Sequence, residues 1–191
     1  MKRLFDIVFS LLALIILLPV FLIVAVVVII DSGFPVFFLQ DRVGKDNKLF
    51  KIIKFRTMKT GTRTSSKANL CESDECITKS GKILRKTSID ELPQLINILK
   101  GDMSFVGPRP LIPEEDEIRN LRAEYGVYAV RPGMTGWAQI NGRDNLSDEE
   151  KARFDKEYVE KKSLAFDIKI LFRTVGVVLS REGVVEGGEN K

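Results

Sequence analysis

An uncharged, strongly apolar run of 24 residues constrains this chain more than any other feature of its sequence. The run extends from Ile7 to Ile30 and reads IVFSLLALIILLPVFLIVAVVVII. About 20 consecutive apolar residues are enough to span the hydrocarbon core of a bilayer as a helix. The run is longer than the apolar region of a usual signal peptide, and no cleavage site of small residues follows it. The sequence therefore predicts a helical segment that enters a membrane.

Two paths through the membrane are compatible with this run. Pro19 lies near its middle, where a proline removes a backbone hydrogen bond and kinks a helix. Basic residues flank the run on both sides, Lys2 and Arg3 before it and Arg42 and Lys45 after it. Because basic residues favour the cytoplasmic side, this distribution suits a re-entrant hairpin with two arms of about 12 residues, each about 18 Å long. A straight span suits the length equally well.

The remainder of the chain, residues 32–191, is rich in charged residues and has the composition of a water-exposed domain. Apolar runs on either side of the turn-type sequence GKDN, residues 44–47, predict a pair of short strands. We therefore expect an α+β fold in two units. A membrane-inserted helical hairpin over residues 1–31 would precede a small, mainly helical domain over residues 32–191 with one short β-hairpin.

Three helices are expected in this domain. The first carries an apolar face at helical spacing, made by Leu92, Leu95, Ile96 and Leu99. The second is expected over residues 148–162, where Ser147 and Glu150 fit a capping box. The third is expected over residues 166–180, where apolar and charged residues alternate around the helix, so that it suits packing on the core or contact with a membrane surface.

Basic residues are concentrated in one segment of this domain. Between Arg42 and Lys67 there are nine basic residues and one acidic residue. Such a block favours anionic partners: phosphorylated substrates, lipid headgroups or nucleic acid. The isoelectric point is near 9.0, but the apolar segment and the lack of a recognition motif in the sequence argue against nucleic-acid binding. A membrane-tethered scaffold that binds anionic lipid without catalysis is an alternative explanation of both features.

Two adjacent carboxylates, Asp90 and Glu91, lie at the start of the sequence SIDELPQLINILKGDMSFVGPRP, residues 88–110. Ser88 and Glu91 match the S-x-x-E pattern of a helix start, so capping alone would explain the pair. The chain has no histidine, however, and a carboxylate can also attack phosphorus or bind Mg²⁺. Phosphoryl transfer needs nearby positive charge. Arginines beside glycine, proline or a helix end would supply it: Arg85, Arg109, Arg131 and Arg143.

Four segments together resemble the bacterial sugar transferases, a family of monotopic polyprenyl-phosphate phosphoglycosyl transferases. The segments are QDRVG (40–44), FKIIKFRTM (50–58), LRKTSIDELPQLINILKGDMSFVGPRPL (84–111) and RPGMTGWAQINGR (131–143). They occur in the family's order and cover nearly the whole chain. Larger members of the family carry additional membrane helices and a further domain before this unit. The chain starts at the apolar segment and resembles the minimal small form.

The resemblance implies transfer of a phospho-sugar from a UDP-sugar to a polyprenyl phosphate such as undecaprenyl phosphate, with release of UMP. This would be the first membrane step of bacterial surface-glycan or glycoconjugate assembly. Asp90 would attack the sugar-bearing phosphate, form a covalent intermediate and contact Mg²⁺, the expected cofactor. Glu91 would be the second catalytic carboxylate. Basic residues at matching positions are expected near phosphate groups: Lys54, Arg56, Arg85 and Arg109, with Arg131 and Arg143 as further candidates.

The resemblance also favours the re-entrant path, with a bend at Pro19 and both ends in the cytoplasm. In the family the bend is made by a Ser-Pro pair, whereas Leu18 precedes the proline here. Leucine lacks the hydroxyl that can satisfy a carbonyl freed by the proline. The chain is therefore expected in the bacterial inner membrane, with the domain facing the cytoplasm. Trp137 and the last helix offer surfaces for a homo-oligomer. The sequence patterns do not identify which sugar is transferred.

Overall fold

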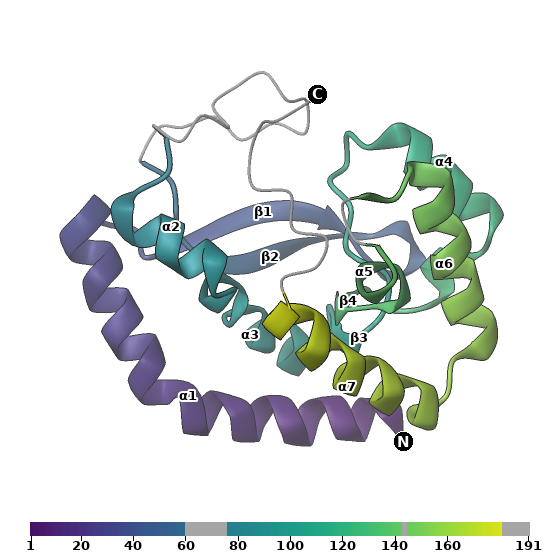
Figure 1. Ribbon diagram of the computed structural model, residues 1–191, viewed down its shortest axis with the longest axis horizontal. Coiled ribbons are helices and arrows are strands. Elements are labelled where there is room, and N and C mark those ends of the chain that lie inside the picture. The colour runs from purple at the N-terminus through teal and green to yellow at the C-terminus, as the bar shows by residue number, and fades with distance from the viewer. Residues whose placement is uncertain (60–75, 143–144, 181–191) are drawn as a thin grey trace.

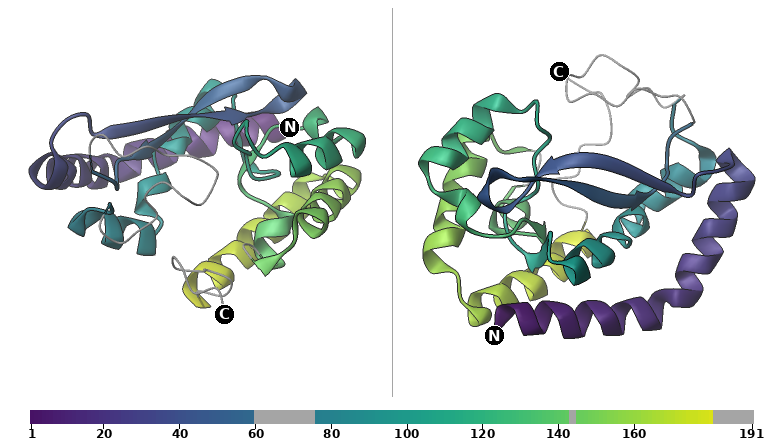
Figure 2. Two further views of the ribbon diagram at one scale, coloured as in Figure 1. Left: turned by 90° about the horizontal axis from the view of Figure 1, so that it is seen from above. Right: turned by 180° about the vertical axis from the view of Figure 1, so that it is seen from behind.

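The apolar run forms most of a single long helix, α1 (Lys2–Ser32), in the computed structural model. Pro19 lies inside this helix, and Figure 1 shows α1 bent near its middle into two arms. Proline is a common cause of a sharp bend in a helix. The arms form an open L rather than two limbs packed against each other (Figure 2). Among the described residues, α1 alone is long and apolar enough to cross a membrane, judged by length and composition only.

The structure describes residues 1–59, 76–142 and 145–180. After α1, the elements in chain order are β1 (Phe37–Val43), the 3₁₀ turn η1 (Lys45–Asn47), β2 (Leu49–Phe55), α2 (Lys79–Lys86), η2 (Ile89–Glu91), α3 (Gln94–Lys100), β3 (Ser104–Val106), α4 (Asp116–Glu124), η3 (Val127–Ala129), β4 (Gly133–Thr135), α5 (Trp137–Ile140), α6 (Asp148–Lys161) and α7 (Leu164–Ser180). Mixed helices and strands agree with the predicted α+β class.

Strands β1 and β2 form the predicted hairpin around the GKDN turn. They pair antiparallel, from Phe37 opposite Phe55 to Val43 opposite Leu49. The turn between them places Asp46 in the left-handed region, with a φ of 56°, which asparagine and aspartate tolerate better than most residues. The hairpin crosses the middle of the molecule (Figure 1) and carries Lys54 on its second strand.

A second, parallel pair of strands was not predicted. Ser104 of β3 lies opposite Gly133 of β4, and Val106 lies opposite Thr135. The backbones approach so closely that a Cβ on Gly133 would lie 2.1 Å from the nitrogen of Gly107. Glycine is therefore required at this position. This pairing brings the GPRP corner next to the RPGMTGW segment, although the two are far apart in the sequence.

Both arms of α1 contribute to the core of the domain. On the second arm, Val24 and Val28 pack with Phe55 of β2 and Leu84 of α2. On the first arm, apolar side chains including Leu17 pack against a cluster formed by Ile52, Leu95, Ile98 and Met103. The opposite face of α1 is exposed, with large apolar side chains along its whole length, such as Leu4, Ile16, Ile23 and Ile30. One face of the helix is thus part of the fold, and the other has no protein cover.

Charged residues at the start of α1 attach it to the domain. The ammonium of Lys2 lies 2.5 Å from a carboxylate oxygen of Asp167 in α7 and also donates to the Tyr158 hydroxyl. Asp6 is 2% exposed, and its carboxylate accepts hydrogen bonds from the Ser104 hydroxyl and a backbone N–H of β3. Arg3 donates to two carbonyls at the end of α3. No local sequence pattern indicates these long-range partners.

The segment around the acidic pair differs from the expected helix start. It is divided into α2, the 3₁₀ turn η2 and α3 rather than forming one helix. Ser88 has a φ of 56° and, within the described residues, its side chain makes no capping hydrogen bond, so the predicted capping box at Ser88 is wrong. A left-handed residue ends one helix and reverses the chain direction. The predicted capping box of Ser147 and Glu150 is confirmed at the start of α6, and the last helix, α7, is also confirmed.

Candidate active site

Asp90 is held in a buried position by the turn that follows Ser88. Its side chain lies in η2, and the residue is 8% exposed. Burial raises the pKa of the Asp90 carboxyl from its ordinary value of 3.8 to about 6, because removal from water disfavours the charged form. The positive charges of Lys54 and Arg85 oppose this rise in the pKa, and the negative charge of Glu91 adds to it. Asp90 thus combines a raised pKa with a cationic neighbourhood, as reactive carboxylates often do.

Glu91 points toward the β-hairpin. One of its carboxylate oxygens lies 2.6 Å from the ammonium of Lys54, and both side chains are mostly shielded from solvent. Lys54 belongs to β2, which packs beside η2, so the strand brings a cation to the acidic pair. Lys54 and Glu91, both candidate site residues from the sequence, are therefore in direct contact.

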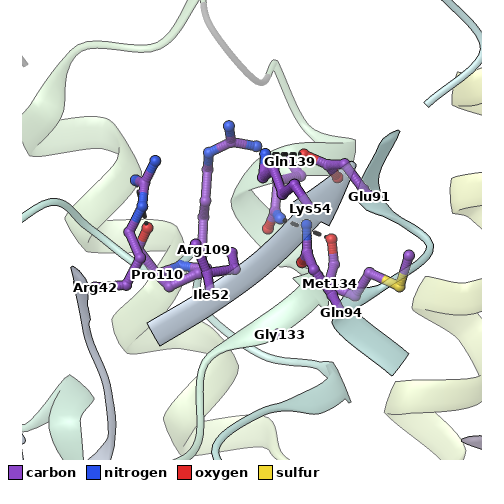
Figure 3. A pocket seen from close by; sticks show the side chains of 10 residues that line it. All are labelled: Arg42, Ile52, Lys54, Glu91, Gln94, Arg109, Pro110, Gly133, Met134 and Gln139. Atoms are coloured by element: carbon purple, nitrogen blue, oxygen red, sulfur yellow. Dashed lines mark hydrogen bonds and ion pairs between the residues drawn. The ribbon is translucent and has the colours of Figure 1, made fainter. Parts of the chain in front are cut away.

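A pocket that is open to solvent lies beside this ion pair. Its walls come from β1, β2, η2, α3, the GPRP corner and the segment around β4 and α5. Figure 3 shows the lining residues: Arg42, Ile52, Lys54, Glu91, Gln94, Arg109, Pro110, Gly133, Met134 and Gln139. Three of these side chains are cationic and one is anionic. The pocket therefore suits a ligand with several negative charges.

Arg42 and Arg109 place two guanidinium groups at this pocket. Arg42 donates to the carbonyl of Pro110 at 3.1 Å and to the side-chain oxygen of Gln40 at 2.7 Å. Burial, with a smaller contribution from the charge of Arg109, lowers the pKa of Arg42 to about 10. The sequence patterns did not single out Arg42 as a candidate site residue. Its place at the pocket depends on the contact between β1 and the GPRP corner, which no local pattern reveals.

A buried ion pair supports the backbone at Arg109. Arg122 of α4 donates from one guanidinium nitrogen to the carbonyl of Arg109, at 2.7 Å. Another nitrogen lies 2.5 Å from a carboxylate oxygen of Asp155 in α6, and both side chains are almost fully buried. Helices α4 and α6 thereby hold the GPRP corner, whose arginine side chain is exposed toward the pocket.

The other predicted basic residues lie in different places. Arg85 acts on Asp90 through its charge and donates to the Thr57 hydroxyl at 3.0 Å. Arg56 donates to the carbonyl of Gly33 at the end of α1. Arg131 donates to the carbonyl of Gly101 at the end of α3, at 2.7 Å. Neither Arg56 nor Arg131 lines the pocket. Arg143 lies outside the described residues.

The acidic pair fits Mg²⁺ only as an ion that shares its ligands with a substrate. Mg²⁺ is usually bound by one or two carboxylates together with substrate phosphates and water. Asp90 and Glu91 could supply two carboxylates. In the described ranges, no group of three or more acidic, cysteine or histidine side chains is arranged to hold a metal ion. The donor set therefore fits Mg²⁺ bound along with phosphate groups.

Comparison with known proteins finds relatives over nearly the whole chain. A family model described as bacterial sugar transferase matches residues 1–181. EpsL of Bacillus subtilis, an uncharacterized sugar transferase, is 47% identical over 184 residues, which cover 96% of this chain and 90% of that protein. The exopolysaccharide production protein ExoY of Sinorhizobium fredii is 41% identical, with 94% of this chain and 86% of that protein covered.

A longer relative has a more specific name. The UDP-glucose:undecaprenyl-phosphate glucose-1-phosphate transferase of Escherichia coli is 43% identical over 182 residues. The match covers 92% of this chain and 39% of that protein, so the chain spans less than half of its length. The family model covers nearly the whole chain, including the acidic pair and every segment that lines the pocket. The chain belongs to the bacterial sugar transferase family.

Proposed function

We propose that this protein transfers a sugar phosphate from a UDP-sugar to undecaprenyl phosphate or a similar polyprenyl phosphate, through a covalent intermediate on Asp90. The observation that carries the proposal is a buried carboxylate of raised pKa beside a pocket lined by Arg42, Lys54 and Arg109. The names of relatives support the substrates: one acts on UDP-glucose and undecaprenyl phosphate, and another is a UDP-galactose-lipid carrier transferase.

The reaction takes place in two displacements at one phosphorus atom. In the first, a carboxylate oxygen of Asp90 attacks the sugar-bearing phosphorus of the UDP-sugar, and the bond to the bridging oxygen breaks. UMP leaves with that oxygen, and an acyl-phosphate that carries the sugar remains on Asp90. In the second, a phosphate oxygen of the lipid attacks the same phosphorus. The acyl-phosphate bond breaks, which restores the Asp90 carboxylate and yields polyprenyl-diphospho-sugar.

The neighbouring cations have separate roles in this scheme. Arg109 and Arg42 line the pocket and bind the phosphates of the donor, since guanidinium groups match phosphate geometry. Lys54 holds Glu91 and reduces the pKa of Asp90, so that a larger share of Asp90 is ionised for attack. Mg²⁺, if bound by Asp90 and Glu91 with the donor phosphates, would neutralise charge on those phosphates.

Helix α1 places the site at a membrane surface in this proposal. Its exposed apolar face needs lipid as cover, and its two arms, about 25 and 20 Å long, are each shorter than a bilayer core of about 30 Å. A re-entrant helix that enters and leaves through the cytoplasmic leaflet of the inner membrane accommodates both arms. The lipid phosphate lies at headgroup level there, and the UDP-sugar arrives from the cytoplasm.

The test is UMP release in detergent with undecaprenyl phosphate, Mg²⁺ and a panel of UDP-sugars. We expect release that requires the lipid and that is lost in Asp90→Asn. Asp116→Asn, an exposed aspartate of α4, is the matched control and should keep full activity. Intact-mass measurement after donor alone should show one added phospho-sugar on the wild type and none on Asp90→Asn.

Two outcomes would contradict the proposal at different points. Release that persists in Asp90→Asn would remove Asp90 as the nucleophile and keep the transferase reaction. Absence of UMP release with every UDP-sugar, from protein that binds vesicles containing anionic lipid, would instead support the alternative of a membrane-tethered scaffold.

A further inference from the structure

Two buried polar atoms at the pocket have no partner. They are Oε1 of Gln139 and Nε of Arg42, and neither forms a hydrogen bond within residues 1–59, 76–142 and 145–180. Both residues line the same pocket. An unpaired buried donor or acceptor costs about 1–3 kcal/mol, so such atoms need an explanation. One unpaired acceptor and one unpaired donor at a single pocket indicate that a ligand completes both.

The hydrogen bond of the Gln139 amide nitrogen orients the side chain and leaves its oxygen without a donor among the described residues. Its nitrogen donates to the carbonyl of Met134 at 3.5 Å, which is at the outer limit of a hydrogen bond. Gly136 provides the space for the amide, because a Cβ at that position would lie 2.4 Å from Oε1 of Gln139. Figure 3 shows Gln139 on the side of the pocket away from Arg42.

The composition of the walls differs from one part of the pocket to another. Arg109 and Lys54 supply positive charge next to Glu91, and Asp90 is the residue directly before Glu91 in the chain. Ile52, Pro110 and Met134 supply apolar surface. A flat base can lie against apolar side chains while its edge forms hydrogen bonds. A sugar ring would instead place several hydroxyl groups against these apolar walls, where they would lose hydrogen bonds to water.

We propose that Gln139 is the residue that recognises the uracil base of the donor: its Oε1 accepts a hydrogen bond from the N3–H of uracil. This inference rests on the proposed function, since it assumes a UDP-sugar donor. The uracil edge carries this N–H between two carbonyl oxygens, while the Nε of Arg42 remains available to a phosphate of the donor. Cytosine has no hydrogen at N3, so Gln139 favours uridine over cytidine nucleotides.

The experiment measures direct binding of UDP, CDP and pyrophosphate to purified protein in detergent by calorimetry. We compare the wild type with Gln139→Met, which keeps the side-chain volume and removes the acceptor, and with Gln139→Glu, which keeps an acceptor oxygen. We expect Gln139→Met to bind UDP about 10-fold more weakly or worse and to lose its preference over CDP. Pyrophosphate affinity should not change, and Gln139→Glu should keep the preference for UDP.

A matched control and three outcomes decide the inference. Asn141→Ala, two residues further along and outside the pocket, should bind UDP like the wild type. Unchanged UDP binding in Gln139→Met with a raised KM for the UDP-sugar would assign the contact to the sugar and overturn the inference. Equal loss of UDP and pyrophosphate affinity would also overturn it. A wild type that binds no UDP would contradict the proposed function itself.

Discussion

The charged groups around Asp90 should determine how activity depends on pH. Lys54 lowers the pKa of Asp90 and Glu91 raises it. Since attack requires the ionised carboxylate, kcat/KM should fall as the pH drops through about 6. Lys54→Met should move this acidic limb to higher pH, and Glu91→Gln should move it to lower pH. Activity profiles between about pH 4.5 and 8 would show this, and an identical limb in both variants would contradict it.

Burial of the ionised Asp90 carboxylate should also lower the free energy of unfolding of the protein. The pKa of Asp90 in the folded protein, about 6, exceeds its ordinary value of 3.8, so the folded state holds the proton more tightly than the unfolded state. The contribution of Asp90 to stability therefore falls as the pH rises from about 4 to 6, by roughly 3 kcal/mol at most. Asp90→Asn should raise the Tm at pH above this window. Circular dichroism melts would test this, and the gain should shrink below about pH 5.

The sequence was sufficient to find those site residues whose partners are adjacent in the chain. Asp90 and Glu91 stand together in the chain, and the absence of histidine drew attention to them. No sequence pattern pointed to Gln139. Its side-chain oxygen becomes buried without a hydrogen-bond partner only in the folded chain, after β3 and β4 have paired. Arg56 was indistinguishable from Lys54 in sequence, yet its partner is the carbonyl at the end of α1.

At the scale of elements, helices α4 and α6 serve the site through one buried ion pair. Asp155→Ala should cost about 3–5 kcal/mol in urea unfolding, because the Arg122 guanidinium is left buried and unpaired. Replacing both partners, Arg122→Met with Asp155→Leu, should recover most of this loss. The double variant should still show a raised KM for the UDP-sugar, because the carbonyl of Arg109 no longer receives a hydrogen bond from Arg122. A normal KM in the double variant would show that this hydrogen bond does not position Arg109.

The bend of α1 has two supports that can be separated. Pro19 favours the bend, and Asp6 holds the first arm against β3. In Pro19→Ala we expect an N-terminal tag to reach the opposite side of the membrane in a fraction of molecules. Adding Asp6→Leu should enlarge that fraction. Protease protection of the tag in spheroplasts and inverted vesicles would measure this fraction. A tag that stays on the domain side in both variants would show that neither Pro19 nor Asp6 maintains the bend.

Elements with a strong periodic or capping signal were predictable, and very short ones were not. The β1–β2 hairpin and helices α6 and α7 follow from alternation, turn residues and the Ser147 cap. Strands β3 and β4 have three residues each, too few to show a period of two. At Ser88 the capping pattern was present but the backbone adopts a left-handed turn, which a spacing rule does not reveal.

At the scale of the whole molecule, the membrane helix and the domain share one core. Without α1, the cluster of Phe55 and Leu84 and the cluster around Ile98 would both be opened to water. A fragment of residues 33–191 should therefore fail to reach the native fold. Size-exclusion chromatography and near-ultraviolet circular dichroism would show aggregation or loss of fixed packing. A fragment with a cooperative melt and the full-length near-ultraviolet spectrum would contradict this expectation.

The ion pair between Lys2 and Asp167 has a consequence for the order in which the protein is made. The two residues are 165 positions apart, so a ribosome delivers the first long before the second. Contacts of such high sequence separation form late. In the proposed setting, α1 enters the bilayer while most of the domain is still untranslated. Lys2 in its first turn then has no ion-pair partner until α7 has been made. Helix α1 would thus reach the membrane early, and its ion pair with Asp167 would form only after α7 has been synthesised.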